Sequence, residues 1–154
     1  MDFEHPPLPP DEYSSDFRQT IGLAPDDILI LQPTRVVPRK GIEHSIELVR
    51  QLNDGSCKLV VSHTAGDEGE AYAEWIRNYA QMMGVPVVFA DPWIHHRRGV
   101  GPEGQKQYTI WDAYKHADNY RVACRFFSYN RVQNELQAIL DKPGLAPPCG
   151  CEPT

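Results

Sequence analysis

The sequence predicts an α/β fold in which a small parallel sheet is covered by helices on both faces, a three-layer αβα arrangement. Three short apolar runs have the length and composition of buried strands. Between them lie two segments whose apolar residues recur at helical spacing. The connections are short, which suits right-handed crossovers between parallel strands. With 154 residues, the chain has the size of one domain.

The three apolar runs are the predicted strands. The first extends from Ile28 to Leu31, directly after two aspartates, and the others cover residues 58–62 and 86–90. None of them alternates regularly between apolar and polar residues, as a strand with one solvated face does. The continuous apolar run from Ile28 to Leu31 is expected of a strand that is buried on both faces.

Helical periodicity fills the two intervals between the strands. In the first interval, apolar residues recur three and four positions apart after Gly41, and Asn-Asp-Gly at 53–55 ends the helix. The second helix ends at Gly84. Its apolar face contains Tyr72, Trp75, Ile76, Tyr79 and Met83. This spacing predicts that the three aromatic rings pack in the core and do not form an exposed stacking platform.

Less regular segments surround this β-α-β-α-β order. Residues 91–107 hold three glycines, prolines and the sequence HHRR, and are predicted to form a long solvated loop. Residues 108–118 and 126–140 are predicted helices. Eight of the 14 prolines lie in the first ten and last twelve residues. The predicted division is a linker-like lead-in at 1–15, an α/β body at 16–142 and a flexible tail at 143–154.

Composition argues against several classes of protein. The net charge is −6, but residues 1–34 hold seven acidic residues and one basic residue, so the remaining chain is neutral. A broad nucleic-acid surface is therefore not expected. No apolar stretch reaches the ~18–20 residues of a membrane span, and the first residues do not resemble a signal peptide. Four scattered cysteines predict a reduced, cytoplasmic protein without a metal site.

The segment between the first strand and the first helix, residues 32–41 (QPTRVVPRKG), is the most informative. In open α/β sheets, ligands bind beyond the carboxyl ends of the strands, where helix N-termini present free N–H groups. Arg35 follows the strand, and Lys40 and Gly41 open the helix. Two cations at such a place suit a phosphate or diphosphate, although these residues are as often solvated surface side chains. The signatures of dinucleotide dehydrogenases and P-loop NTPases are absent from the sequence.

The stretch TRVVPRKG at 34–41, followed by an amphipathic helix, resembles the G-R-x-x-x-x-K-G motif of retaining GT-B glycosyltransferases of the family 4 type. In that family the arginine and lysine bind the diphosphate of a nucleotide sugar, which implies this role for Arg35 and Lys40. The similarity extends to residues 16–27, 58–63, 86–91 and 112–118. The resemblance implies a Rossmann-like fold, that of the C-terminal lobe that binds the nucleotide sugar.

The sequence departs from the family pattern after Asp118. The family continues there with a strand and a glycine-rich turn, which opens a helix with two glutamates spaced E-x7-E that hold the donor sugar and the ribose. Here Asn119 begins a segment that is similar to the family's final helix, so the chain resembles a lobe with an internal deletion. No residue takes the place of either glutamate, and no segment resembles the acceptor lobe. No catalytic residue is therefore assigned.

The resemblance implies the donor-binding part of a glycosyltransferase that transfers a hexosyl group from an NDP-sugar with retention, without a metal or other cofactor. This chain alone is expected to be inactive. The alternative is a non-catalytic α/β module that binds phosphate or a nucleotide, or a degenerate remnant. His63 and Asp91 follow the second and third strands and are candidate donor contacts, or else plain polar residues at strand ends.

The apparent deletion also affects the expected sheet. In the strand order of the complete fold, 3-2-1-4-5, strand one is central, and loss of strand four leaves the run from Ile28 to Leu31 at an edge. An exposed apolar edge is a template for pairing with another chain. The sequence therefore predicts a homodimer through this strand, or aggregation.

Overall fold

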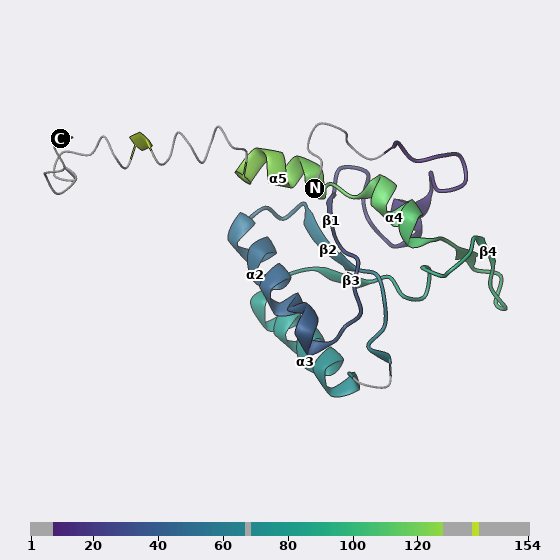
Figure 1. The fold of residues 1–154 in the computed structure, drawn as a ribbon, viewed down its shortest axis with the longest axis horizontal. Coiled ribbons are helices and arrows are strands. Elements are labelled where there is room, and N and C mark those ends of the chain that lie inside the picture. The colour runs from purple at the N-terminus through teal and green to yellow at the C-terminus, as the bar shows by residue number, and fades with distance from the viewer. Residues whose placement is uncertain (1–7, 67–68, 128–136, 139–154) are drawn as a thin grey trace, which may run out of the picture. The chain divides into compact units, whose positions relative to one another are not determined.

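The computed structural model describes residues 8–66, 69–127 and 137–138. The chain divides into two compact units, residues 1–119 and 120–154, and the sheet belongs to the first (Figure 1). The helix α5 (Asn119–Phe127) continues into the second unit. Most of the helix predicted at 126–140, and all of the tail predicted at 143–154, lie outside the described residues.

Three parallel strands form the sheet: β1 (Ile28–Gln32), β2 (Cys57–Val61) and β3 (Val87–Phe89). Their order is β1-β2-β3, so β2 is central. Ile28 lies opposite Cys57, and Leu59 lies opposite Val87. Each apolar run forms the strand that was predicted from it, which confirms a small α/β fold with a parallel sheet.

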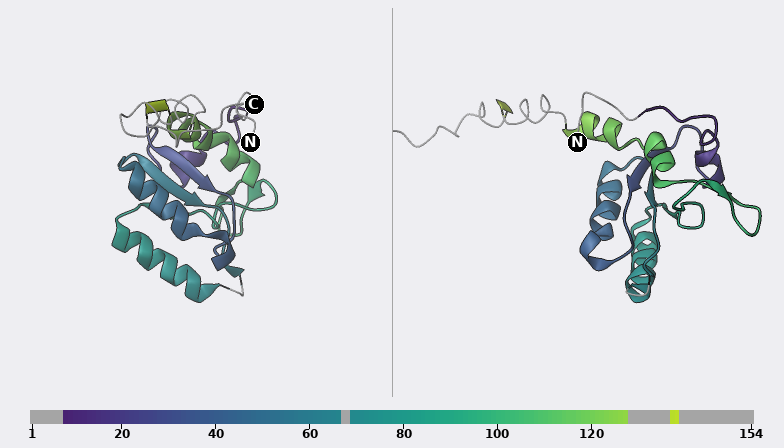
Figure 2. Two further views of the ribbon diagram at one scale, coloured as in Figure 1. Left: turned by 60° about the vertical axis from the view of Figure 1, so that its left-hand side comes forward. Right: turned by 45° about the vertical axis from the view of Figure 1, so that its right-hand side comes forward.

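Helices lie on both faces of the sheet. On one face, α2 (Ile42–Leu52) packs against β2 and against α3 (Glu70–Met83). On the other face, α1 (Phe17–Thr20) packs against α4 (Ile110–His116), which meets β1. The right-hand view of Figure 2 shows α2 and α4 on opposite sides of the strands.

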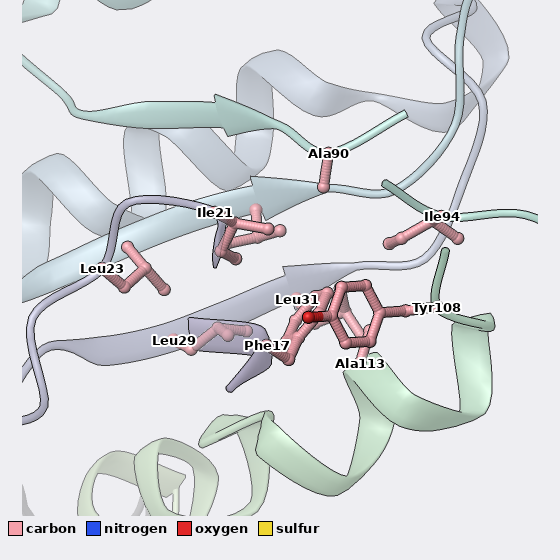
Figure 3. Packing of buried hydrophobic residues seen from close by; sticks show 10 residues of the cluster. Phe17, Ile21, Leu23, Leu29, Leu31, Ala90, Ile94, Tyr108 and Ala113 are labelled. Atoms are coloured by element: carbon pink, nitrogen blue, oxygen red, sulfur yellow. The ribbon is translucent and has the colours of Figure 1, made fainter. Parts of the chain in front are cut away.

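Successive side chains of each strand point to opposite faces of the sheet, so the buried residues fall into two groups, one on each face. Leu29, Leu31 and Val60 belong to one cluster with Phe17 and Tyr108, and each of the five side chains is at most 4% exposed. Figure 3 shows the labelled side chains of α1 and of the segment before α4 meeting those of β1. The intervening strand residues point to the face that α2 covers. The run at 28–31 is thus buried on both faces from Leu29 to Leu31, as predicted, whereas the three residues of β3 are only half-buried.

The aromatic residues of α3 do not lie in the core, which contradicts the prediction. The helix instead buries a stripe in which two of the three residues are alanines: Ala73, Ile76 and Ala80. Tyr72, Trp75 and Tyr79 stack on one another along the helix, with ring centroids 5.8 and 5.2 Å apart. The indole of Trp75 is 48% exposed. Both sets fit helical spacing, and the small alanine side chains allow closer packing of the helix than the aromatic rings would.

The segment predicted to be a long loop contains a short hairpin of β4 (Gly99–Val100) and β5 (Lys106–Gln107). The phenol of Tyr13 holds it: the hydroxyl accepts from the Gly99 N–H at 3.1 Å and donates to the Gln107 carbonyl at 2.6 Å. Arg98 and Lys106 place their cationic groups 4.6 and 4.4 Å from the centroid of the same ring. Because these contacts join distant parts of the chain, no local pattern indicated the hairpin.

The strand β1 lies at an edge of the sheet, as predicted, but this edge is not open. The N–H of Asp118 donates to the Leu29 carbonyl at 2.7 Å, and the carboxylate of Asp118 accepts from the Leu29 N–H at 2.9 Å. The carboxamide of Asn119 accepts from the Leu31 N–H at 2.8 Å and donates to the Leu31 carbonyl at 2.9 Å. Since the neighbouring residues of β1 bond to β2, Leu29 and Leu31 carry the groups that a further strand would use.

These four hydrogen bonds remove the basis of the predicted homodimer through Ile28 to Leu31. Asp118 and Asn119 make the hydrogen bonds that a neighbouring strand would make with Leu29 and Leu31, partly through their side chains. Arg18 extends the cover by donating to the Asp27 carbonyl at 2.6 Å while it pairs with Asp118 at 2.6 Å. The prediction of an open edge was wrong because it considered a helix as the only cover, and a helix cannot satisfy such groups.

Among the residues that the structure describes, no helix combines the length and the apolar composition that a membrane span requires.

The buried imidazole of His116 is expected to make the protein less stable as the pH falls below about 6.5. The side chain is 7% exposed, and its Nε2 lies 2.7 Å from the Ser14 carbonyl, to which it donates. Burial lowers the pKa of His116, and the bond to Ser14 offsets only part of this effect. Because the unfolded state then binds a proton more readily, the free energy of unfolding decreases from about pH 6.5 downward.

Urea unfolding between about pH 7.5 and pH 5 measures this effect. The variant His116→Gln, which cannot titrate, should lose part of the pH dependence in this range, and the remainder is expected from His63, whose pKa is also lowered by burial. The carboxylates of Asp16 and Asp112 have lowered pKa values, so their contribution is lost only at more acidic pH. An equal slope in the variant and the wild type would contradict the assignment to His116.

Candidate functional site

The loop between β1 and α2 carries Arg35 and Lys40. Both side chains are exposed, but the loop is anchored because Val36 and Val37 are each 2% exposed. It ends in the short 3-10 helix η1 (Pro38–Lys40). Two cations therefore project from a fixed backbone at the carboxyl end of β1.

The carboxamide of Gln32 ties this loop to itself and to α2. Its Nε2 donates to the Lys40 carbonyl at 3.1 Å and to the Thr34 hydroxyl at 3.3 Å, and its Oε1 accepts from the Ser45 hydroxyl. Gly41 follows with a φ of 58°, in the left-handed region that glycine adopts without strain. One side chain at the end of β1 thus holds both ends of the segment that bears the two cations.

Arg35 is held against the turn that follows β2. Its Nη2 donates to the Ala65 carbonyl at 3.1 Å. The same nitrogen would lie only 2.3 Å from a Cβ atom placed on Gly66, which has a φ of +63°. Glycine at position 66 therefore serves both the backbone conformation and the close approach of the guanidinium group.

A cavity of about 570 Å³, here called the strand-end cavity, opens beside this turn. Val36, the turn at 64–66, the first half of α3 and Asp91 line it. Its charged lining residues are Glu70, Glu74, Arg77 and Asp91. The guanidinium group of Arg77 lies over the ring of Phe89, 4.8 Å from its centroid. Three of these four charged residues are carboxylates, which accept hydrogen bonds from hydroxyl groups, so the cavity suits the hydroxyl-bearing part of a ligand.

The structure separates the residues that the sequence proposed as one site. Asp91 lines the strand-end cavity, and Arg35 is bonded to its wall. Lys40 ends η1 and Gly41 is the N-cap residue of α2, and neither lines that cavity. His63 lines a different hollow of about 340 Å³, together with residues 94–96 and 109–111.

Sequence reasoning did not identify Gly66, Glu70, Glu74 or Arg77. The three charged residues look like the solvated side of a helix, and the fold alone brings them to the carboxyl end of the sheet. The position of Gly66 just after a predicted strand was the available signal, because loops at that end of a parallel sheet bind ligands.

Within the described residues, no group of three or more histidine, cysteine, aspartate or glutamate side chains is arranged to hold a metal ion. His63 makes a short hydrogen bond with the Ser62 hydroxyl through Nδ1. Burial lowers the pKa of His63, and the neighbouring His96 lowers it further. The imidazole of His63 is therefore held neutral near pH 7, as a hydrogen-bonding group and not as a charge.

No family model, no curated protein and no solved structure matches this chain.

Proposed function

We propose that the chain binds a nucleoside diphosphate or nucleotide sugar at the carboxyl end of its sheet. Arg35 and Lys40 bind the diphosphate, and the strand-end cavity takes the hydroxyl-bearing part of the ligand. The observation that carries the proposal is the position of Arg35, an exposed guanidinium group that is bonded to the wall of a cavity lined by carboxylates.

The charges support one orientation of the ligand. Glu70, Glu74 and Asp91 repel a phosphate group inside the cavity, but they accept hydrogen bonds from the hydroxyl groups of a ribose or a hexose. The diphosphate therefore stays on the loop at 33–41, where both cations project and where Gln32 fixes the backbone. This division agrees with the resemblance to the nucleotide-sugar-binding lobe of retaining GT-B glycosyltransferases.

The proposed role is donor binding without transfer by this chain alone. The sequence has no counterpart of the E-x7-E glutamates, and the cavity carboxylates lie on α3 and after β3, not on a helix that follows a fourth strand. A Rossmann-like donor lobe of a hexosyltransferase acting with retention thus remains the preferred interpretation, with the resemblance as its support. A non-catalytic module that binds phosphate or a nucleotide shares the binding step and the absence of turnover.

Titration calorimetry with UDP and GDP tests the phosphate site. We expect weak binding, roughly 0.1–10 mM, because the site is open to solvent. The double variant Arg35→Ala/Lys40→Ala should weaken binding at least about tenfold, and added salt should weaken it in the wild type. Arg39→Ala, which removes a neighbouring exposed cation from the same loop, is the matched control and should change the affinity less than about twofold.

Two further measurements separate the parts of the proposal. Asp91→Ala should weaken binding of UDP but not of inorganic pyrophosphate, because the carboxylate contacts only the hydroxyl-bearing part. Incubation with NDP-sugars and acceptors should give no transfer product. Equal nucleotide affinity in the double variant and the wild type would refute the phosphate site, and product formation would refute binding without transfer.

A further inference from the structure

A second hollow, with a volume of about 340 Å³, differs from the strand-end cavity in chemistry. His63 lines this hollow, and the next residue, Thr64, lines the strand-end cavity. We call it the histidine hollow. Its volume is near the lower end of the range of small-molecule sites, which suits a single ring and not a whole nucleotide sugar.

The lining of the histidine hollow carries no permanent charge. Among the described residues that line it, none is aspartate, glutamate, lysine or arginine. Its polar groups are the imidazoles of His63, His95 and His96 and the side chain of Thr109, and buried Ile94 contributes an apolar surface. An ionic ligand would lack a fixed countercharge there, so the lining favours an uncharged ligand.

Neutral imidazoles offer one donor and one acceptor each, in either tautomer. Hydroxyl groups are donors and acceptors at once and adapt to both tautomers. His95 is oriented by a 3.0 Å contact of its Nε2 with the Pro92 carbonyl, and His63 by its bond to Ser62. Each of these bonds leaves one ring nitrogen for a ligand, and a hydroxyl group can pair with that nitrogen whether the nitrogen donates or accepts, so the hollow suits a ring with several hydroxyl groups.

An exposed indole borders the hollow. Trp111 lies in the first turn of α4 and is 70% exposed. Tyr114 packs beside it, with ring centroids 5.7 Å apart. The start of α4 is fixed by the reciprocal hydrogen bonds of Thr109 and Asp112. An exposed indole on a fixed helix start, next to a polar hollow, presents an apolar face on which the C–H face of a ring packs.

We propose that the histidine hollow binds a pyranose unit of a carbohydrate, with its C–H face on Trp111 and its hydroxyl groups on the imidazoles. The proposal does not depend on the nucleotide site, because neither Arg35 nor the strand-end cavity takes part. A carbohydrate without phosphate therefore serves as the probe, and failure of one site leaves the other intact.

Proton–nitrogen NMR of the tryptophan indoles tests the proposal directly. The chain has three tryptophans, so single Trp→Phe variants assign the indole signals. Titration of the full chain with methyl glucoside, methyl mannoside and maltotriose should shift the Trp111 signal saturably, with Kd on the order of 1–10 mM. Trp75, also exposed but on α3, is the internal control and should not shift.

Variants complete the test. Trp111→Ala should weaken sugar binding at least about tenfold, and His63→Ala should weaken it several-fold, whereas Trp75→Ala should leave it unchanged. Because Trp111 is exposed, its variant should keep the backbone spectrum of the wild type outside α4. The proposal is overturned if the Trp111 signal does not shift, if Trp75 shifts equally, or if only uridine and adenosine, and none of the sugars, shift Trp111.

Discussion

Replacing Asp118 by alanine is expected to destabilise the protein by roughly 3–5 kcal/mol, a large part of the stability of an ordinary domain. The carboxylate is 9% exposed and pairs with Arg18, itself 20% exposed, at 2.6 Å. It also accepts from the N–H of Leu29, a residue that is fully buried. The substitution leaves one buried donor without an acceptor and one largely buried cation without its partner, and both costs add to the loss of the bonds themselves.

Urea unfolding of two further variants shows how much of the lost stability comes from the charge of Asp118 and how much from its hydrogen bonds. Asp118→Asn keeps an oxygen for Leu29 but removes the charge that faces Arg18, so it should cost less than alanine, about 1–2 kcal/mol. Asp26→Ala removes an exposed carboxylate near the start of the same strand and should change stability by less than about 0.5 kcal/mol. A loss below about 1 kcal/mol for Asp118→Ala would show that the edge contacts contribute little.

The same contacts are expected to keep the wild type monomeric. Light scattering over a concentration series should give a single species of 17.5 kDa. The double variant Asp118→Ala/Asn119→Ala removes the side-chain partners of Leu29 and Leu31, so it should associate through the opened edge at concentrations where the wild type does not. A dimeric wild type would contradict this prediction and would support the homodimer that was expected from the sequence.

The second large effect is expected at Asp112, whose replacement by alanine should cost about 2–4 kcal/mol. The side chain is 1% exposed and accepts from the Thr109 N–H at 2.9 Å, which caps α4. It also accepts two hydrogen bonds from Arg98, which joins it to Asp11. The expected loss is smaller than at Asp118 because Arg98 is 36% exposed and water replaces part of the pairing.

The pH dependence of this contribution provides an independent check. Burial raises the pKa of Asp112, but the hydrogen bonds from Arg98 and Thr109 outweigh it, and the pKa is lowered overall. The contribution is therefore complete above about pH 4 and is lost as the pH falls through the lowered pKa. Urea unfolding of Asp112→Ala and of Glu103→Ala, an exposed control beside the hairpin, measures the difference. Equal stability of the two variants would contradict a role for the buried carboxylate.

Much of the fold could be predicted because its determinants are local. The runs at 28–31, 58–62 and 86–90 became parallel strands, and the helix after Gly41 began within one residue of its expected start. Prediction failed on α3, because two faces of that helix have helical spacing and only packing decides which is buried. It also failed on the hairpin at 99–107, whose shape depends on a tyrosine near the start of the chain.

The candidate sites, too, could be predicted only in part. The sequence pointed to Arg35, Lys40 and Asp91 because a strand end followed by a helix is a recognisable ligand position. It did not indicate that Arg35 lies over Gly66 or that α3 supplies carboxylates. It also joined His63 to the same site, whereas the structure places His63 in a separate hollow with Trp111. Which side chains share a cavity depends on how helices and strands that are distant in the sequence pack together. The local spacing of residues does not contain that information.

The sequence by itself determined that three apolar segments form a parallel sheet, and that the run from Ile28 to Leu31 is buried, because burial on both faces requires uninterrupted apolar residues. The edge position of the strand from Ile28 to Leu31 was expected from the resemblance, and the structure has this strand at an edge. Only the tertiary structure decided that this edge is closed. The closing bonds join residues 88 and 89 positions apart, and they exist because Asp118 and Asn119 carry short acceptors and a donor at the spacing of a strand's backbone groups.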